Sequence, residues 1–421
     1  MNSLTYFALR PVGELAIWGW RLERRTEFLW RDQFDHYLRP PLFAAAQTLT
    51  NAGKSDQGLA LAEERELPDE ERCIQEIIDE IAAFMKDTWL PGGVQRFGNT
   101  KTFGVVKGEF TVLDGLPDHL RHGVLAHERT YPAWVRFSGP GPYAPSDLDD
   151  YGQCSMAIKL MDVPGPKLMD DERFTQDVLL GSAPVCVAAN VRENAKLQRA
   201  VRNETSPFYY LDPRGPLLVG LMQALYSRMH HSPLEVQYYS TVPSLLGAGQ
   251  AVQYSLKPRS SASTKVPAKP ADNYLRSAMA RTLAGGDVSF DFMVQVQTDP
   301  RRMPIEDATV KWPEDLSPYV PVARLRLPRQ RFDSDEQLAF ANVLSYNPWH
   351  SKPEHRPLGN TNRARRRVYA ELSHLRQSMN QAPHIEPTGA EQFPGSVPAE
   401  STRAGNGRPR RPPTTSRPAG G

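Results

Sequence analysis

The stretch with the most chemistry in its spacing is the run from Thr361 to Gln377, TNRARRRVYAELSHLRQ, in which one tyrosine stands among regularly placed arginines. On an α-helix, Arg365, Tyr369 and Arg376 fall within about 40° of one face. A free phenol has a pKa of roughly 10, so it becomes an anionic ligand at neutral pH only where a fixed cation stabilises the phenolate. Arg365, one turn before Tyr369, is placed to be that cation.

A phenolate on a helix is one of the few protein ligands for ferric haem. An arginine further along the same face, here Arg376, suits a haem propionate because its planar fork matches a carboxylate. The alternative is an arginine-rich amphipathic helix with a half-buried tyrosine and no ligand. This segment alone leaves both interpretations open.

Composition excludes several classes of protein. The chain has 421 residues and a net charge of +2, which gives no global electrostatic case for binding nucleic acid. Cys73, Cys154 and Cys186 lie too far apart to indicate a disulfide framework or a CxxC metal site, and this favours a reducing compartment. No apolar run is long enough to span a bilayer, and no signal peptide is evident. We therefore expect a cytoplasmic protein.

The sequence divides into three parts. Residues 1–66 are expected to form an N-terminal helical arm and linker, 67–380 one large domain, and 381–421 a disordered tail rich in Pro, Arg and Gly. The arm mixes tryptophans with arginines and is predicted to be helical up to Pro40-Pro41. It could dock on the body, on a second subunit or on a membrane surface, and docking is favoured.

The large domain is predicted to be α+β. Eight short β-prone runs are separated by turn signals, with helices inserted between two sets of four, and this pattern favours a closed eight-stranded antiparallel barrel over an alternating parallel sheet. The predicted strands are 103–113, 130–138, 155–163, 176–180, 236–241, 251–257, 288–298 and 319–327. The predicted helices are 68–89, 190–202, 216–229, 273–283, 334–344 and 361–377.

Four of these segments, VVKGEFTVLDGLP, RTYPAWVRFS, MAIKLMDVPG and HRPLGNTNRARRRVYAELSHLR, together resemble the haem-dependent catalase superfamily, in its short branch that lacks a C-terminal flavodoxin-like domain. The resemblance runs from about residue 70 to 380. It implies haem b as the cofactor, with Tyr369 as the axial ligand of the haem iron and Arg365 holding the phenolate. It also implies that Arg96, Arg136 and Arg376 bind the propionates.

The expected distal side departs from that family and is degenerate. The distal histidine would fall three residues after Arg96, where this sequence has Asn99. The distal asparagine would stand just before the proline of GSAPV, where this sequence has Gly181 or Ser182. No other histidine has a spacing that obviously replaces the missing one.

This departure changes the expected chemistry. Breaking the O–O bond of hydrogen peroxide heterolytically needs a group that takes a proton from one oxygen and returns it to the other, and an imidazole with a pKa of about 6.5 can do both. A carboxamide donates and accepts hydrogen bonds but carries no proton. Asn99, with Thr100 and Ser182, is therefore expected to orient a peroxide without shuttling its proton.

We therefore expect a haem-dependent oxidoreductase acting on organic or fatty-acid hydroperoxides rather than a fast catalase. The alternatives are a weakly active catalase or peroxidase and a non-catalytic haem-binding or sensing protein. A hydroperoxide enzyme would need an apolar channel, for which Phe103, Val105 and Leu179 are candidates unless they are ordinary barrel core. The expected partner is a small peroxide and not a nucleic acid. A homo-oligomer and a peripheral membrane contact through the arm both stay open.

Overall fold

The computed structural model describes residues 22–52, 58–260, 264–267 and 269–394. Its centre is a closed antiparallel β-barrel of eight strands in the order β5-β4-β3-β2-β1-β9-β8-β7, which the pairing of β5 with β7 closes, while the short β6 adds to β7. The predicted α+β barrel is confirmed. The strands are β1 (Thr102–Val112), β2 (Thr130–Ser138), β3 (Ser155–Leu160), β4 (Gln176–Gly181), β5 (Tyr238–Tyr239), β6 (Ser244–Leu245), β7 (Ala251–Pro258), β8 (Val288–Val296) and β9 (Val320–Leu327).

The side chains of the barrel strands point alternately into the barrel and outward. On β2, Val135 and Phe137 belong to the apolar cluster that fills the barrel, and an eight-stranded barrel has room for little else inside. Arg136 lies between them and therefore points outward. It pairs with Ala157 on β3, which pairs with Leu179 on β4, so these three residues form one row across the outer face.

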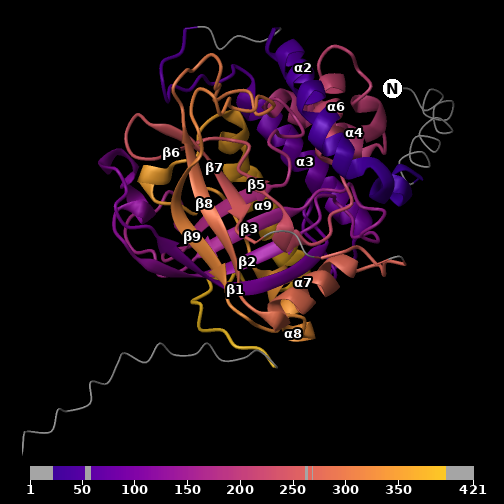
Figure 1. Ribbon diagram of the computed structural model, residues 1–421, viewed down its shortest axis with the longest axis vertical. Helices are drawn as coiled ribbons and strands as arrows, with labels where there is room; N and C mark the ends of the chain where they lie inside the picture. The colour runs from indigo at the N-terminus through magenta and orange to yellow at the C-terminus, as the bar shows by residue number, and fades with distance from the viewer. Residues whose placement is uncertain (1–21, 53–57, 261–263, 268, 395–421) are drawn as a thin grey trace, which may run out of the picture.

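Helices cover the outside of the barrel on several sides (Figure 1). The three that matter most for function are α3 (Glu70–Thr88), α4 (Val191–Arg202) and α9 (Asn360–Asn380). The others are α2 (Arg39–Ala52), α5 (Ser206–Tyr209), α6 (Pro216–Tyr226), α7 (Tyr274–Gly285) and α8 (Asp335–Val343), with short 3-10 turns at Asp118–Leu120, Gly123–Leu125, Pro233–Glu235 and Pro353–His355.

Helices α3, α4 and α9 run parallel, and polar contacts fix their register. Three side-chain pairs join α4 to the α3 region at separations of 123, 123 and 122 residues, namely Arg192 with Asp69, Arg199 with Glu76 and Arg202 with Glu80. Arg363 with Glu70 and Arg367 with Gln75 join α9 to α3 at separations of 293 and 292 residues, and Arg367 also contacts Glu71, one helical turn earlier on α3. Because these separations in sequence are nearly constant along the helices, the three helices run in the same direction and begin at the same end.

Residues 22–52, the described helical part of the N-terminal arm, pack on the body. Helical residues 22–33 lead into a π-helical turn (Phe34–Leu38) and then into α2. Arg31 donates to the main-chain oxygen of Leu225 (2.7 Å), and Phe43 packs against Met222. The prediction that the helix ends at Pro40-Pro41 is wrong. The prolines stand at the start of α2, where a missing N–H costs little, because a turn with different hydrogen bonding precedes them.

The C-terminal boundary also differs from the prediction. Residues 381–394 lie along the barrel, where Glu391 accepts a hydrogen bond from the indole of Trp134 (2.8 Å) and Phe393 packs on the same ring. The expected disordered tail therefore does not begin at 381. Composition could not show this, because the reason is an outward-facing tryptophan on β2 that this segment covers. The rest of the tail lies outside the described residues.

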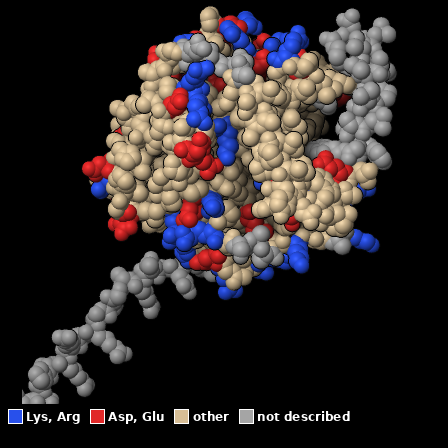
Figure 2. Space-filling model, turned by 45° about the horizontal axis from the view of Figure 1, so that its top comes forward, with Lys and Arg blue, Asp and Glu red and all other residues tan. Residues whose placement is uncertain are grey.

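The surface gives no sign of a large patch of one charge on the face that Figure 2 shows, where acidic and basic side chains are interspersed. Among the described residues, no helix combines the length and the apolar character that a membrane crossing requires.

Candidate functional site

A cavity of about 350 Å³ lies between the outer face of β2–β4 and helix α9. This volume is in the range of small-molecule sites, roughly 300 to 1,000 Å³. The barrel supplies Arg136, Ser138, Ser155, Ala157 and Leu179, and further walls come from α3, α4 and the loops at residues 96–99, 186–188 and 345–346.

Helix α9 forms one wall. Its lining residues are Thr361, Ala364, Arg365, Val368, Tyr369, Leu372, Ser373 and Arg376, at spacings of three or four that mark a single helix face. The helix starts where Gly359 adopts φ +86°, and a Cβ there would lie 2.4 Å from the Ile305 carbonyl oxygen. Asn360 then ties the helix start to α4 by accepting from the Val191 N–H (2.8 Å). The predicted face of α9 thus opens on the cavity.

Three of the arginines predicted from the sequence converge at this cavity, and we call Arg96, Arg136 and Arg376 the arginine triad. Their hydrogen bonds go to main-chain carbonyls and hydroxyls. Arg96 donates to the oxygen of Leu344 (2.6 Å), while Arg136 donates to the oxygen of Asn99 (2.7 Å) and to the hydroxyl of Thr102 (2.6 Å).

The triad has no counter-charge among the described residues, since none of its members has a carboxylate within ion-pair distance there. Burial lowers the pKa of Arg96 to about 10 and that of Arg376 to about 9, and it holds the pKa of Arg136 well below its usual value. The three charges also repel one another. Buried cations are normally paired, so this end of the cavity is built to receive an anion.

Tyr346 adds an unused polar group beside the triad. Its hydroxyl is shielded from solvent and has no hydrogen-bond partner among the described residues, although the residue lines the cavity. Burial raises the pKa of Tyr346, with the nearby Arg136 and Arg96 opposing the shift, so the phenol is a neutral donor at pH 7. The sequence analysis did not single out this tyrosine, which stands in the irregular segment SYNPWH.

Tyr369 and Arg365 both line the cavity, one turn apart on α9. Tyr369 is half-buried. The guanidinium of Arg365 donates to the side-chain oxygen of Asn362 (3.3 Å), and among the described residues it makes no hydrogen bond to Tyr369. The structure thus places the predicted ligand and its predicted partner side by side without joining them.

Of the three residues predicted for the distal side, only Asn99 lines the cavity. Asn99 lines the cavity with φ +51°, a left-handed conformation that asparagine tolerates better than most residues. Thr100 and Ser182 are not brought to the cavity wall. The Thr100 hydroxyl donates to the Arg96 oxygen (2.7 Å), and the Ser182 hydroxyl accepts from the Cys154 N–H (3.0 Å).

The described lining contains no histidine, aspartate or glutamate. It contains instead two amides that the sequence analysis did not single out, Asn194 and Gln198 on α4. Of the three candidate channel residues, Leu179 lines the cavity, whereas Phe103 and Val105 belong to buried apolar clusters. The cavity can therefore bind and orient a ligand, but its described wall holds no imidazole or carboxyl group to carry a proton, and its titratable side chains are the arginines, Tyr346, Tyr369 and the Cys186 thiol.

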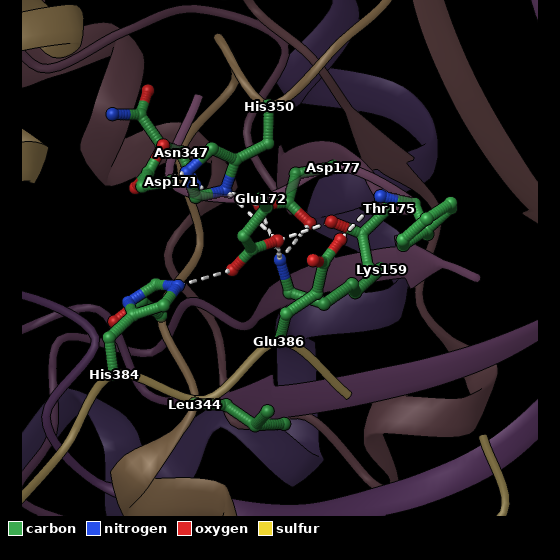
Figure 3. Close-up of polar contacts among 12 residues, drawn as sticks. Lys159, Asp171, Glu172, Thr175, Asp177, Leu344, Asn347, His350, His384 and Glu386 are labelled. Atoms are coloured by element: carbon green, nitrogen blue, oxygen red, sulfur yellow. Dashed lines mark hydrogen bonds and ion pairs between the residues drawn. The ribbon is translucent and has the colours of Figure 1, made fainter. Parts of the chain in front are cut away.

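A second polar cluster lies on the same outer face of β3 and β4, where Lys159 pairs with Asp177 two residues along from Ala157 and Leu179. Lys159 forms ion pairs with Glu172 and with Asp177 (2.8 Å), and His350 bonds Asp177 (2.8 Å) and Asp171 (3.0 Å). Figure 3 shows the ammonium between the two carboxylates, the place that a metal ion would take. Asp177 also accepts from the main-chain N–H of residue 347 (2.9 Å), so the cluster anchors the segment that carries Tyr346.

Comparisons with known proteins agree with this architecture. No family model and no curated protein sequence matches the chain. The structure is similar to that of a fungal catalase, with a TM-score of 0.58 and 16% identity over 80% of this chain and 70% of that one. It is also similar to a bacterial catalase, with a TM-score of 0.52 and 14% identity over 83% of this chain and 71% of that one. The fold is therefore catalase-like.

Proposed function

We propose that the chain binds haem b in the cavity and acts as an oxidoreductase on hydroperoxides. The observation that carries the proposal is the arginine triad, the buried Arg136 and Arg376 and the half-buried Arg96, none of which has a carboxylate partner among the described residues, at a cavity that Tyr369 also lines. Haem b brings the complementary features, two propionates and an iron that accepts a phenolate. The donor set therefore fits this cofactor.

The residues would divide the work as follows. Tyr369 would bind the haem iron through its phenolate, Arg365 one turn away would stabilise that phenolate, and the arginine triad would pair with the propionates. The bound haem would supply the redox chemistry that the protein side chains lack. Asn99 would orient the peroxide by hydrogen bonds.

Organic or fatty-acid hydroperoxides are favoured over rapid disproportionation of hydrogen peroxide. The described cavity wall has no imidazole or carboxyl group to pass a proton between the two peroxide oxygens. It has apolar positions, among them Leu179, Val187 and Ala188, that suit an organic substituent. The same lack of a proton carrier is the observation that favours the second candidate, a haem-binding protein with little or no turnover.

The test is haem loading followed by absorption spectroscopy. The purified protein is titrated with hemin, and the wild type is compared with Tyr369→Phe and with the control Tyr37→Phe, which changes a tyrosine that is 70% exposed on the arm. We expect a ferric spectrum of the phenolate-ligated type in the wild type and in the control, and its loss in Tyr369→Phe. A wild type that takes up no haem, or an unchanged spectrum in Tyr369→Phe, would exclude the proposal.

The substrate class is tested in the same cuvette. The loaded protein is mixed with hydrogen peroxide or with a fatty-acid hydroperoxide, and oxygen release and lipid products are followed. Consumption of the lipid hydroperoxide alone supports the enzyme. Retention of haem without turnover of either peroxide supports the binding protein, and rapid oxygen release shows that a proton carrier exists outside the described wall.

A further inference from the structure

Two side-chain amides on α4 line the cavity without a role in the scheme above. Gln198 donates to the side-chain oxygen of Asn194 (2.7 Å), which fixes the plane of the Asn194 amide. The Asn194 Nδ2 group has no hydrogen-bond partner among the described residues and is not shielded from solvent or from the cavity. It is therefore a donor with a fixed orientation on the wall of the cavity.

The helix register places these amides level with the predicted iron ligand. Side-chain pairs separated by 123 residues join α4 to the α3 region, and pairs separated by 293 and 292 residues join α9 to α3. Gln198 is thus level with Val368 and Tyr369 on α9, and Asn194 lies one turn nearer the helix start. The arginine triad, through Arg376, lies two turns further along, since seven residues of helix span about 10 Å.

A purely structural role does not explain the pair. The Gln198 Nε2 group donates a hydrogen bond to Asn194. The Gln198 side-chain oxygen is buried and has no hydrogen-bond partner among the described residues, and such a group normally lowers the stability of the folded state. Ile77 and Ile81 of α3 line the same cavity, and hydrogen bonds beside apolar walls are stronger than in water. Unsatisfied amides in such a place are expected where a ligand completes them.

We propose that Asn194 is a further substrate-binding residue, which donates a hydrogen bond to an oxygen of the bound hydroperoxide, and that Gln198 is its positioning residue. This inference rests on the proposed function and deepens it, because it gives the peroxide a second amide besides Asn99. The resemblance had led us to expect such an amide at Gly181 or Ser182. No proton is transferred in this binding step, since a carboxamide N–H only donates.

The test uses fluoride as a probe, because fluoride bound to ferric haem accepts hydrogen bonds and takes no part in turnover. Fluoride affinity is measured by absorption titration of the hemin-loaded wild type, Asn194→Leu and Gln198→Met. Gln75→Met is the matched control, since Gln75 is an exposed amide at the same level on α3. We expect both cavity variants to bind fluoride about tenfold more weakly or worse, the size of one lost hydrogen bond to a charged acceptor.

A second readout separates binding from structure. Thermal unfolding of the haem-free proteins is compared, and Gln198→Met is expected to be at least as stable as the wild type because it removes the unpartnered buried oxygen. Reaction rates of the loaded proteins with cumene hydroperoxide should fall together with fluoride affinity.

The outcomes distinguish the two proposals. If the wild type takes up no haem, the proposed function fails. If it takes up haem but binds no fluoride, or if both cavity variants bind fluoride within twofold of the wild type, this inference alone is overturned. The inference would also be overturned if Gln198→Met lost as much free energy of unfolding as free energy of fluoride binding, since the Gln198 amide would then be a structural element.

Discussion

Arg96 and Arg376 bind the same short piece of main chain. Both guanidiniums donate to the carbonyl oxygens of residues 342 and 344, Arg96 at 3.5 and 2.6 Å and Arg376 at 3.4 Å to the second oxygen. The two arginines come from sequence positions 280 residues apart. Neutral carbonyls hold them in place without cancelling their charge, so both remain available to an anion.

Replacing Arg376 with methionine is predicted to weaken haem binding by about ten- to a hundredfold, because a charge-assisted hydrogen bond contributes roughly 1.5–3 kcal/mol. Hemin titration of the purified variant measures this. Arg324→Met is the control, because Arg324 lies on β9 with 45% of its side chain exposed. Equal affinities in the two variants would show that the triad does not hold the cofactor.

Replacing Asn99 with histidine is predicted to raise oxygen release from hydrogen peroxide at least tenfold in the haem-loaded protein, because an imidazole supplies the missing proton carrier. The backbone at φ +51° admits histidine at a modest cost, roughly 1–3 kcal/mol at most. Asn99→Gln keeps the amide chemistry and serves as the control. If both variants release oxygen at the wild-type rate, other parts of the distal side must also differ from a catalase.

Stability is predicted to fall as the pH rises from about 6.5 to about 9. Burial acts to lower the pKa of His350, but hydrogen bonds to Asp171 and Asp177 outweigh it and raise the pKa to about 9. Because the pKa of His350 is higher in the folded chain than in the unfolded chain, protonation of His350 stabilises the folded state. This stabilisation is complete at a pH below the unfolded-state pKa of about 6.5, and it is lost as the pH rises through the folded-state pKa. The loss is on the order of 3 kcal/mol, at roughly 1.4 kcal/mol for each pKa unit.

Urea unfolding at pH 6 and pH 9.5 checks this prediction. His350→Gln should be less stable than the wild type at pH 6 and should show a smaller loss at alkaline pH. His119→Gln is the control, because His119 is an exposed histidine near β1. An identical alkaline loss in the wild type and in His350→Gln would refute the assignment to this residue.

Ending the chain after Asn380 is predicted to destabilise it, because Trp134 loses the cover of Phe393 and the carboxylate acceptor of its indole N–H. The expected cost is about 2–4 kcal/mol from the lost aromatic burial and the lost hydrogen bond of the indole N–H to a carboxylate. Unfolding of a chain ending at Pro394, which keeps every one of these contacts, provides the comparison. Equal stability of the two truncated chains would mean that the segment rests on the barrel without stabilising it.

Local sequence signals located the elements well. Turn residues and β-prone runs marked all eight barrel strands, and hydrophobic periodicity located α3, α4 and α9 to within a few residues. Closure of the barrel could not be predicted locally, since it depends on a β5 of only two residues, Tyr238–Tyr239, that pairs with β4 and β7.

The site was predictable where a helix face or a strand alternation fixes the direction of a side chain. Arg365, Tyr369 and Arg376 share a face of α9, and Arg136 alternates outward on β2. Thr100 was chosen because it follows Asn99, and Ser182 because it stands at an expected distal position, and neither reason gives the direction of a side chain. Asn194 and Gln198 could not be recognised without the neighbours of α4, because an i, i+4 pair of amides is typical of any solvated helix.

The uncharged partners of the arginine triad, main-chain carbonyls and hydroxyls, have a practical consequence for handling the protein. Guanidiniums that can bind two carboxylates can also bind phosphate and sulfate. If the cavity binds haem as proposed, buffers that contain these ions are expected to compete with hemin for it and to lower the haem occupancy of preparations loaded after purification. A chloride buffer without phosphate, or loading during expression, avoids that competition.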